Sequence, residues 1–192
     1  MAVTPSNLVQ GPATLYFGVF GATEPSDANV SIPPASSSWT DFGATNGGVT
    51  FELDQTYTPL TVDQLVDPVG ARLTARAISC VATLNEITVA NMYQVMNLLA
   101  TTNTQSTYLT LDPLTTNSAT QPTYTALLID GWAPTLNTGL AARRRIIIRK
   151  TLAETKLAVK YDKPNRAEFA VTFTSYYIST SIAPFHIVDQ LS

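Results

Sequence analysis

The chain of 192 residues carries a formal net charge of −3, and only 13% of its residues are charged. This length suits one domain with a substantial core, and the small negative charge argues against a nucleic-acid-binding protein that relies on bulk attraction to phosphates. A single cysteine, Cys80, and a single histidine, His186, exclude an internal disulfide and a zinc site built from several Cys and His ligands. We therefore expect one domain over residues 1–192.

The N-terminal part of the chain is predicted to form an arm, a strand and a long loop. Residues 1–12 are polar and contain proline, which indicates an N-terminal arm. Residues 13–21 are aromatic and β-branched, which predicts the first strand. Residues 22–38 are rich in Ser, Pro and Ala, and a loop is expected there because proline donates no hydrogen bond to a strand ladder.

Two further strands are predicted to flank a projecting loop. Apolar and polar residues alternate over 48–58, which is typical of a half-buried strand, and Glu52 and Asp54 fall on its polar face. Residues 72–83 form the next extended run. The loop between them, residues 59–70, mixes apolar and acidic side chains, which indicates a contact surface. The residues assigned to this contact are Leu60, Val62, Asp63, Leu65, Val66 and Asp67.

One helix is predicted over residues 88–100. Thr88 is a suitable N-cap, because its hydroxyl can accept a hydrogen bond from a free backbone N–H of the first turn. Apolar residues then recur at spacings of three and four, which places them on one face of the helix. These residues are Val89, Met92, Tyr93, Met96 and Leu99.

The remainder of the chain is predicted to be strands joined by polar turns and ended by a tail. A polar turn is expected at 101–106, and the tail covers residues 179–192 with one short apolar run at 185–188. Together with the earlier elements, this predicts a mainly β fold with one helix. The predicted strands of this part cover residues 107–111, 123–132, 143–150, 151–162 and 166–178.

Basic residues are concentrated near the C-terminus. Residues 1–71 contain no Lys or Arg, whereas nine of the eleven basic residues lie between Arg143 and Arg166. The asymmetry fits either strand pairing within one fold or contact between an acidic loop of one copy and a basic surface of another. The first arrangement would pair the basic strand with Glu52 or Asp54. The second makes Arg143, Arg145 and Arg149 candidate intersubunit residues, with Asp63 or Asp67 of an adjacent copy as their partners.

No motif for catalysis or cofactor binding is found in the sequence. His186 lies in the predicted tail, and no Gly-x-Ser-x-Gly nucleophile elbow accompanies it. Gly47-Gly48 leads into a strand and is not a phosphate-binding loop. We expect no enzymatic activity, no catalytic residue, no cofactor and no metal. The sequence also shows no signal peptide and no membrane-spanning run, so no membrane partner is expected.

Several short motifs follow one another in an order that resembles a known family. They are Gly18-Val19, Trp39-Thr40-Asp41-Phe42-Gly43, Thr45-Asn46-Gly47-Gly48-Val49, Asp63-Gln64, Asp67-Pro68-Val69, Leu84-Asn85-Glu86 and Phe185-His186-Ile187. In this order the chain resembles the major tail proteins, or tail tube proteins, of long-tailed non-contractile bacteriophages, especially those of actinobacterial hosts. Each motif is short, and the likeness lies in their joint order and spacing.

The resemblance implies a fold and a role. The fold would be two packed antiparallel β-sheets, as a sandwich or small barrel, flanked by one helix. Six copies would form a ring, and rings would stack into a tube that conducts double-stranded DNA without binding it. Loop 59–70 would reach the adjacent ring, and Glu52 and Asp54 are candidates for the lumen wall. The Arg-rich strand departs from the family, whose lumen is usually acidic or neutral.

The implied partners are other copies of the chain, a tape measure protein, and tail terminator and distal tail proteins. The implied location is the virion tail, assembled in the host cytoplasm. A β-sandwich adhesion or capsid-decoration module that forms no tube is the alternative, and the composition fits it nearly as well.

Overall fold

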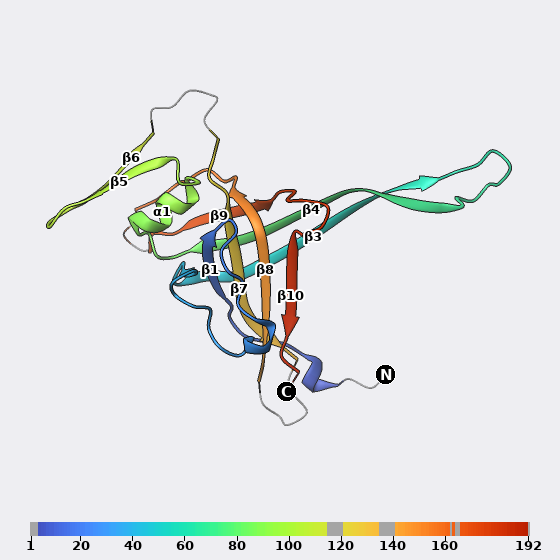
Figure 1. Ribbon diagram of the computed structural model, residues 1–192, viewed down its shortest axis with the longest axis horizontal. Helices are drawn as coiled ribbons and strands as arrows, with labels where there is room; N and C mark the ends of the chain where they lie inside the picture. Colours follow the sequence, from blue (N-terminus) through green and yellow to red (C-terminus); the bar gives the residue numbers. More distant parts are fainter. Residues whose placement is uncertain (1–3, 115–120, 135–140, 162, 164–165, 192) are drawn as a thin grey trace.

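The computed structural model describes residues 4–114, 121–134, 141–161, 163 and 166–191. The protein is mainly β, with two antiparallel sheets and one α-helix, which confirms the fold class at that level (Figure 1). Within the described residues no pairing joins the two outer strands of the large sheet, so the sheet does not close into a barrel. Residues 1–3 of the predicted N-terminal arm and residue 192 of the predicted tail lie outside the described residues.

The large sheet has eight strands, and its main order is β2-β1-β7-β8-β9-β4-β3, with β10 also paired to β8. Neighbouring strands of this sheet are antiparallel. The strands are β1 (Thr14–Val19), β2 (Thr40–Asp41), β3 (Thr45–Leu60), β4 (Gly70–Leu84), β7 (Thr125–Ala133), β8 (Ala142–Ala153), β9 (Phe169–Ser175) and β10 (Phe185–Asp189). The second sheet contains β5 (Ala100–Thr104) and β6 (Leu109–Pro113). Short 3-10 helices cover η1 (Pro5–Asn7) and η2 (Asp27–Asn29).

One apolar core connects the half of the large sheet that contains β1, β7 and β8 with the half that contains β9, β4 and β3. Phe42 packs against Phe17 of β1 at a ring-centroid distance of 4.6 Å and against Phe173 of β9 at 5.7 Å. Phe51 of β3 similarly meets Phe185 of β10 at 5.3 Å. The fully or nearly buried side chains come from both halves, so the sheet curves around a shared core. They include Leu15, Leu127, Ile148, Ile78, Cys80, Leu84, Val171 and Phe173.

Helix α1 (Val89–Val95) is shorter than predicted, and its buried face differs from the predicted one. The N-cap prediction is confirmed, because Thr88 Oγ1 accepts a hydrogen bond from the backbone N–H of Asn91 at 3.1 Å. The buried helix residues are Asn91 and Val95, whereas the predicted stripe is only half-buried. Asn91 can be buried because its Nδ2 donates to the carbonyls of Phe42 and Glu86, each at 2.8 Å.

Three other predicted segments differ in the structure. The predicted turn 101–106 contains β5, whose side chains are polar on both faces and therefore show no alternation. Residues 151–162 were expected to form a strand. Instead β8 ends at Ala153, and residues 154–160 alternate between exposed and half-buried without forming a strand. Residue 162 of this predicted strand lies outside the described residues. The predicted tail contains β10, which pairs with β8.

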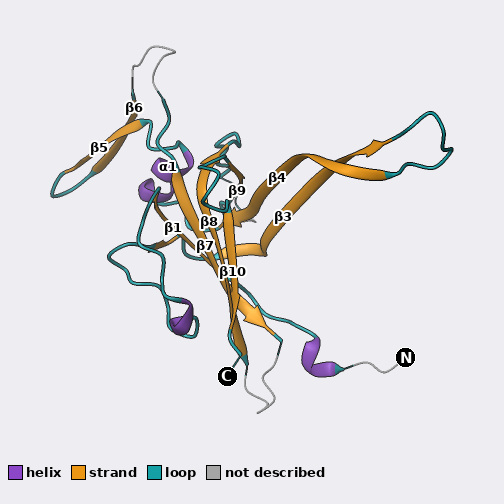
Figure 2. Ribbon diagram, turned by 45° about the vertical axis from the view of Figure 1, so that its right-hand side comes forward, coloured by secondary structure: helices purple, strands orange, loops and turns teal. Residues whose placement is uncertain are grey.

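Two hairpins leave the body in different directions. The β3–β4 hairpin and the β5–β6 hairpin extend from opposite sides in both views (Figures 1 and 2). The β3–β4 hairpin starts in the core and ends far outside it, so it is the feature that most needs a functional explanation.

Candidate functional site

The outer part of the β3–β4 hairpin, residues 53–77, is exposed along its whole length and is called the arm below. Its strands are longer than predicted, because the predicted loop 59–70 begins and ends inside β3 and β4. Pro59 pairs with Ala71 and Leu60 pairs with Gly70, which leaves residues 61–69 as the tip. A two-stranded hairpin is at best marginally stable in water by itself. The arm therefore has the features of an element that contact with a partner stabilises.

The two faces of the arm differ in chemistry because side chains alternate along each strand. One face continues the core outward: Phe51 and Cys80 are opposite each other in the body, followed by Leu53 opposite Ile78 and then Tyr57 opposite Leu73. Leu53, Tyr57 and Leu73 are all more than two-fifths exposed. Exposed apolar side chains in a continuous row mark a contact surface.

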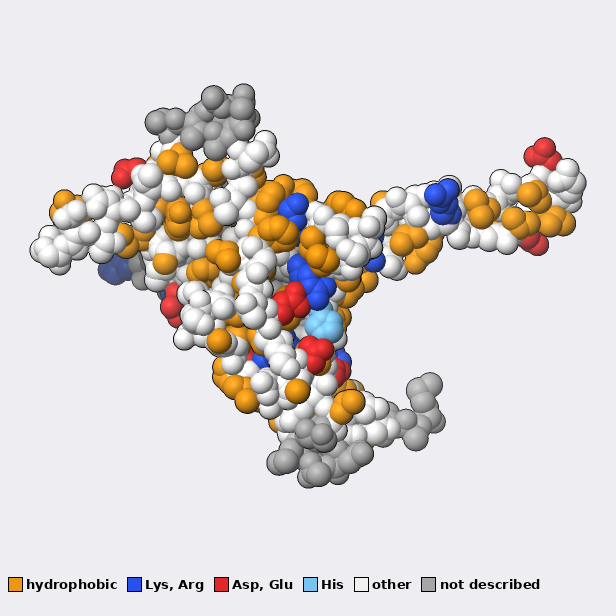
Figure 3. All heavy atoms as spheres, viewed as in Figure 1, with side chains coloured by type: hydrophobic (Ala, Val, Ile, Leu, Met, Phe, Trp, Pro, Cys, Tyr) orange, Lys and Arg blue, Asp and Glu red, His pale blue; other side chains and the backbone are white. Residues whose placement is uncertain are grey.

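Every residue assigned to the contact loop lies at the tip or next to it and is exposed: Leu60, Val62, Asp63, Leu65, Val66 and Asp67. Val66 is exposed over its full area. The tip is held at its base by a hydrogen bond from the N–H of Val69 to the carbonyl of Leu60 at 2.9 Å. Figure 3 shows hydrophobic side chains along the arm and acidic ones at its end. Their role in contact between rings stays a prediction.

Glu52 and Asp54 are exposed on the other face of β3. Glu52 Oε2 accepts a hydrogen bond from Ser79 Oγ on β4 at 2.9 Å. Two more carboxylates accept hydrogen bonds near this part of the sheet: Glu168 from Asn46 and Glu154 from Thr174, each at 2.9 Å. We call the set of Glu52, Asp54, Glu154 and Glu168 the acidic face.

A β-bulge changes the expected position of the arm arginines. Because Arg72 and Arg76 are four residues apart, a regular strand would place both on one face. The register instead shifts between Thr56 and Tyr57 of β3, where β4 carries the extra residue Thr74. Arg76 lies between this bulge and the body and is opposite Gln55, on the apolar side, whereas Arg72 lies beyond the bulge and is opposite Thr58, on the polar side. Only Arg72 therefore shares a face with Glu52 and Asp54.

The basic strand β8 finds its partners within the same chain. Arg143 Nη2 lies 2.7 Å from Asp130 Oδ2, a carboxylate that is buried on β7. Arg149 Nη2 donates to Glu24 Oε2 at 2.9 Å, and Glu24 belongs to the predicted loop 22–38. None of these partners is Glu52, Asp54 or an arm residue. The intersubunit role of Arg143 and Arg149 stays a prediction.

Arg145 cannot have the predicted intersubunit role, because its side chain is fully buried inside the subunit. Its Nη2 donates to the carbonyl of Ile32 at 2.7 Å. Burial lowers the pKa of this guanidinium, and Asp130, directly opposite on β7, acts against that shift. Arg145 is thus an internal support for the loop. Strand alternation alone could not reveal this, because loop 22–38 covers that side of β8.

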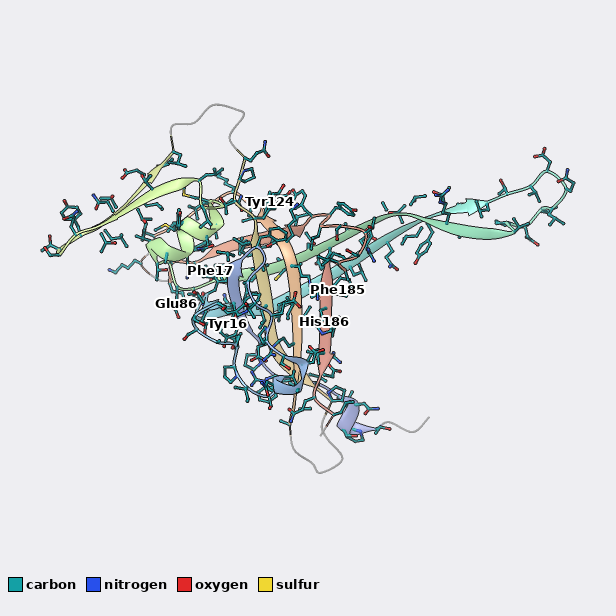
Figure 4. The ribbon with its side chains drawn as sticks, in the orientation of Figure 1. Tyr16, Phe17, Glu86, Tyr124, Phe185 and His186 are labelled. Carbon is teal, nitrogen blue, oxygen red and sulfur yellow. The ribbon has the colours of Figure 1, made fainter. Side chains whose placement is uncertain are left out.

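His186 also contacts loop 22–38. Its Nε2 lies 3.0 Å from Asp27 Oδ1, and Figure 4 places it beside Phe185 on β10. The loop is therefore fixed to β8 and β10 by Glu24, Asp27 and the carbonyl of Ile32. Sequence reasoning missed these attachments, since they join residues more than a hundred positions apart.

The described residues contain no arrangement that points to catalysis. The thiol of Cys80 is buried, and burial together with the nearby Glu52 raises its pKa to about 12, so it is not a reactive thiolate at neutral pH. Among these residues no group of three or more His, Cys, Asp or Glu could hold a metal ion. Nor does that part of the chain contain a helix long and apolar enough to cross a bilayer.

Comparison with known proteins assigns no family to the chain. No family model matches the sequence, and no curated protein matches it as a relative. The function of the protein is therefore inferred from the geometry of the arm and of the surfaces around it.

Proposed function

We propose that this protein is a structural subunit that assembles with copies of itself into stacked rings, and that the rings form a tube through which double-stranded DNA passes. In this proposal the protein is a virion component of a bacteriophage tail, assembled in the host cytoplasm. The proposal rests on the arm, together with the order of sequence motifs described above.

The observation that carries the proposal is an apolar face that leaves the core and continues along an exposed two-stranded arm. Such a face is unfavourable in water and becomes favourable once a partner covers it. A second copy of the chain is the partner that is always present at the same concentration. When the surface on one copy differs from the surface it meets on the next, such contacts repeat, and they give a filament along any axis on which they do not close into a ring.

The free edge of the large sheet at β3 supports a lateral contact between copies of the chain. β3 is an outer strand of the large sheet and has 16 residues. Its free edge presents unpaired backbone groups that a strand of another copy can pair with. Six copies joined in this way would form the ring, with the two halves of each sheet packed as a sandwich. Closure of the ring removes the exposed edges.

The acidic face fits the lumen of such a tube. Carboxylates at Glu52 and Asp54 repeated around a ring would repel phosphates weakly at every position, so that DNA passes without being held. In this arrangement the tape measure protein occupies the lumen before DNA release, and terminator and distal tail proteins cap the two ends of the tube.

Electron microscopy of the purified protein at high concentration tests the proposal. We expect rings or tubes from the intact chain. A variant in which Thr61 to Asp67 is replaced by a two-residue turn should remain a folded subunit and form no tubes. A substitution at Thr102 on the exposed hairpin β5–β6 serves as the control for a change outside the arm. Monodisperse particles from the intact chain at every concentration would instead favour an adhesion or decoration module.

A further inference from the structure

A groove opens at the base of the arm, where the core side of β4 leaves the body. It has a volume of about 630 Å³ and is bounded by β4, the end of β9 and the segment that leads to β10. We call it the root groove. Its wall is partly apolar, and it also carries one guanidinium and several hydroxyls. The lining residues used below are Arg76, Ile78, Ser175, Ile178 and Ile182.

Two polar groups in the root groove have no partner among the residues that the structure describes. The side chain of Arg76 is exposed, and it makes no ion pair or hydrogen bond with any of them. The hydroxyl of Ser175 is buried there without a hydrogen-bond partner. By contrast, Arg143, Arg144 and Arg149 of β8 are all paired with carboxylates.

The register of β4 against β3 places Arg76 on the core side of the hairpin. Arg76 is opposite Gln55 and shares a face with Ile78, whereas Arg72 lies beyond the bulge at Thr74 and is opposite Thr58 on the other face. The groove therefore combines a cation and a hydroxyl with apolar walls. This combination suits a segment that carries a carboxylate next to branched aliphatic side chains.

The arm tip has that composition. Residues 61–69 contain Asp63 and Asp67, no Lys or Arg, and the exposed side chains of Leu65 and Val66. Within one chain the tip lies at the far end of the arm from its base (Figure 1), so it does not fill its own groove. A tip in the groove must come from another copy.

We infer that the root groove is the receptor for the arm tip of a second copy of this chain, with Arg76 binding Asp63 or Asp67 of that copy and the apolar wall receiving Leu65 and Val66. This inference depends on the proposed self-assembly and names the surface that the arm meets. Tip and groove are different surfaces of one chain, so each docked copy presents a free tip and a free groove. The contact is head-to-tail and propagates along one axis.

Charge reversal tests the contact. In Arg76→Glu the groove repels the acidic tip, and we expect the protein concentration needed for tube assembly to rise about tenfold or more, which corresponds to about 1.4 kcal/mol per tenfold change. In Asp63→Lys with Asp67→Lys, the altered tip should repel an intact groove to a similar extent. The triple variant that carries all three changes should assemble at close to the original concentration, because attraction is restored with the charges exchanged.

Arg72→Glu is the matched control. Arg72 is on the same strand and is also exposed, but it faces away from the groove, so its reversal changes net charge equally without altering the groove. We expect it to assemble like the unaltered protein. Thermal unfolding of each variant checks that the subunit is intact, as exposed charge changes should alter stability by less than about 0.5 kcal/mol.

The outcomes separate this inference from the proposed function. Loss of assembly in Arg76→Glu with rescue in the triple variant supports the groove as receptor. If the intact chain and Arg76→Glu assemble at equal concentrations, the groove is not the receptor, and self-assembly through the arm stands. Equal loss in Arg76→Glu and Arg72→Glu, without rescue in the triple variant, also overturns the groove. Absence of any assembly by the intact chain overturns both.

Discussion

Arg145 donates a hydrogen bond from Nη2 to the backbone carbonyl of Ile32 at 2.7 Å, and thereby fixes loop 22–38 to the sheet from inside. Longer contacts of 3.4 Å reach the carbonyls of Asn29 and Val30. All three carbonyl oxygens are reached from Nη2, and a side chain that cannot donate hydrogen bonds would leave them without this donor.

We expect Arg145→Leu to lower the free energy of unfolding by about 3 kcal/mol, because several carbonyls lose their donor and Asp130 loses a neighbouring cation. Chemical denaturation monitored by tryptophan fluorescence measures this change. Arg144→Leu is the control: Arg144 is on the same strand but is only partly buried, and its loss should cost less than about 1 kcal/mol. Equal costs for the two variants would contradict the internal role of Arg145.

The helix offers a test of which face is buried. Val95→Ala should destabilise the protein by roughly 1–3 kcal/mol, because Val95 packs in the core, and Met96→Ala should cost clearly less, because Met96 is only half-buried. The sequence-based stripe predicts the reverse, since it contains Met96 and omits Val95. Thermal unfolding of the two variants decides between the assignments.

The pairing of Asp189 with Arg144 makes the stability of the fold depend on pH. The hydrogen bonds and charge of Arg144 lower the pKa of the Asp189 carboxyl below its value in the unfolded chain. The pair therefore stabilises the fold above that unfolded-state pKa, and the stabilisation is lost as the pH falls through the folded-state pKa. Both side chains are partly exposed, so the contribution is under about 1 kcal/mol.

Asp189→Asn should remove this contribution. We expect the difference in melting temperature between Asp189→Asn and the unaltered protein to be largest near neutral pH and to shrink on acidification. A difference that grows on acidification would contradict this assignment. Thr102→Val, at an exposed position of β5, is the control. Gln190→Glu is unsuitable, because Gln190 accepts a hydrogen bond from the N–H of Arg143.

The assignment of Glu52 and Asp54 to the lumen can be tested by reversing their charges. Under the lumen proposal, Glu52→Lys with Asp54→Lys leaves tube assembly intact, and the tubes retain added DNA at low salt and release it as salt rises. Co-sedimentation of DNA with tubes measures this. Lysines at Thr101 and Asn103 on β5 serve as the control for added positive charge elsewhere. Loss of assembly without DNA retention would instead place Glu52 and Asp54 in a contact between subunits.

The hairpin could be predicted from sequence because its alternation is long and regular, and the tip because its apolar and acidic residues have no local partner. The helix was found from Thr88 and the apolar spacing, but its buried face was misassigned because Asn91, a polar residue, takes an inward position through two hydrogen bonds. Periodicity counts apolar residues only, so it cannot detect a buried amide with satisfied donors.

The candidate groove could not be predicted from the sequence, for a different reason. Its wall is assembled from β4 and from the end of β9 with the segment before β10, which lie far from β4 in the sequence, and no local pattern brings them together. The partners of the basic strand were also out of reach, since Arg149 and Glu24 are 125 positions apart. Pairings over such distances are fixed by the topology of the sheet and not by local pattern.

The alternation of the arm restricts how its length can vary among related chains. Removing or adding one residue in a strand would exchange the apolar and polar faces beyond that point, and the tip would present the wrong side. Unless a bulge such as the one at Thr74 absorbs the change, only paired changes, two residues in each strand, keep both faces in place. With a rise of about 3.3–3.4 Å per residue, the reach of such an arm changes in steps of about 6.7 Å. In an assembly built on this arm, the spacing between successive subunits can therefore change only in steps of two residues per strand.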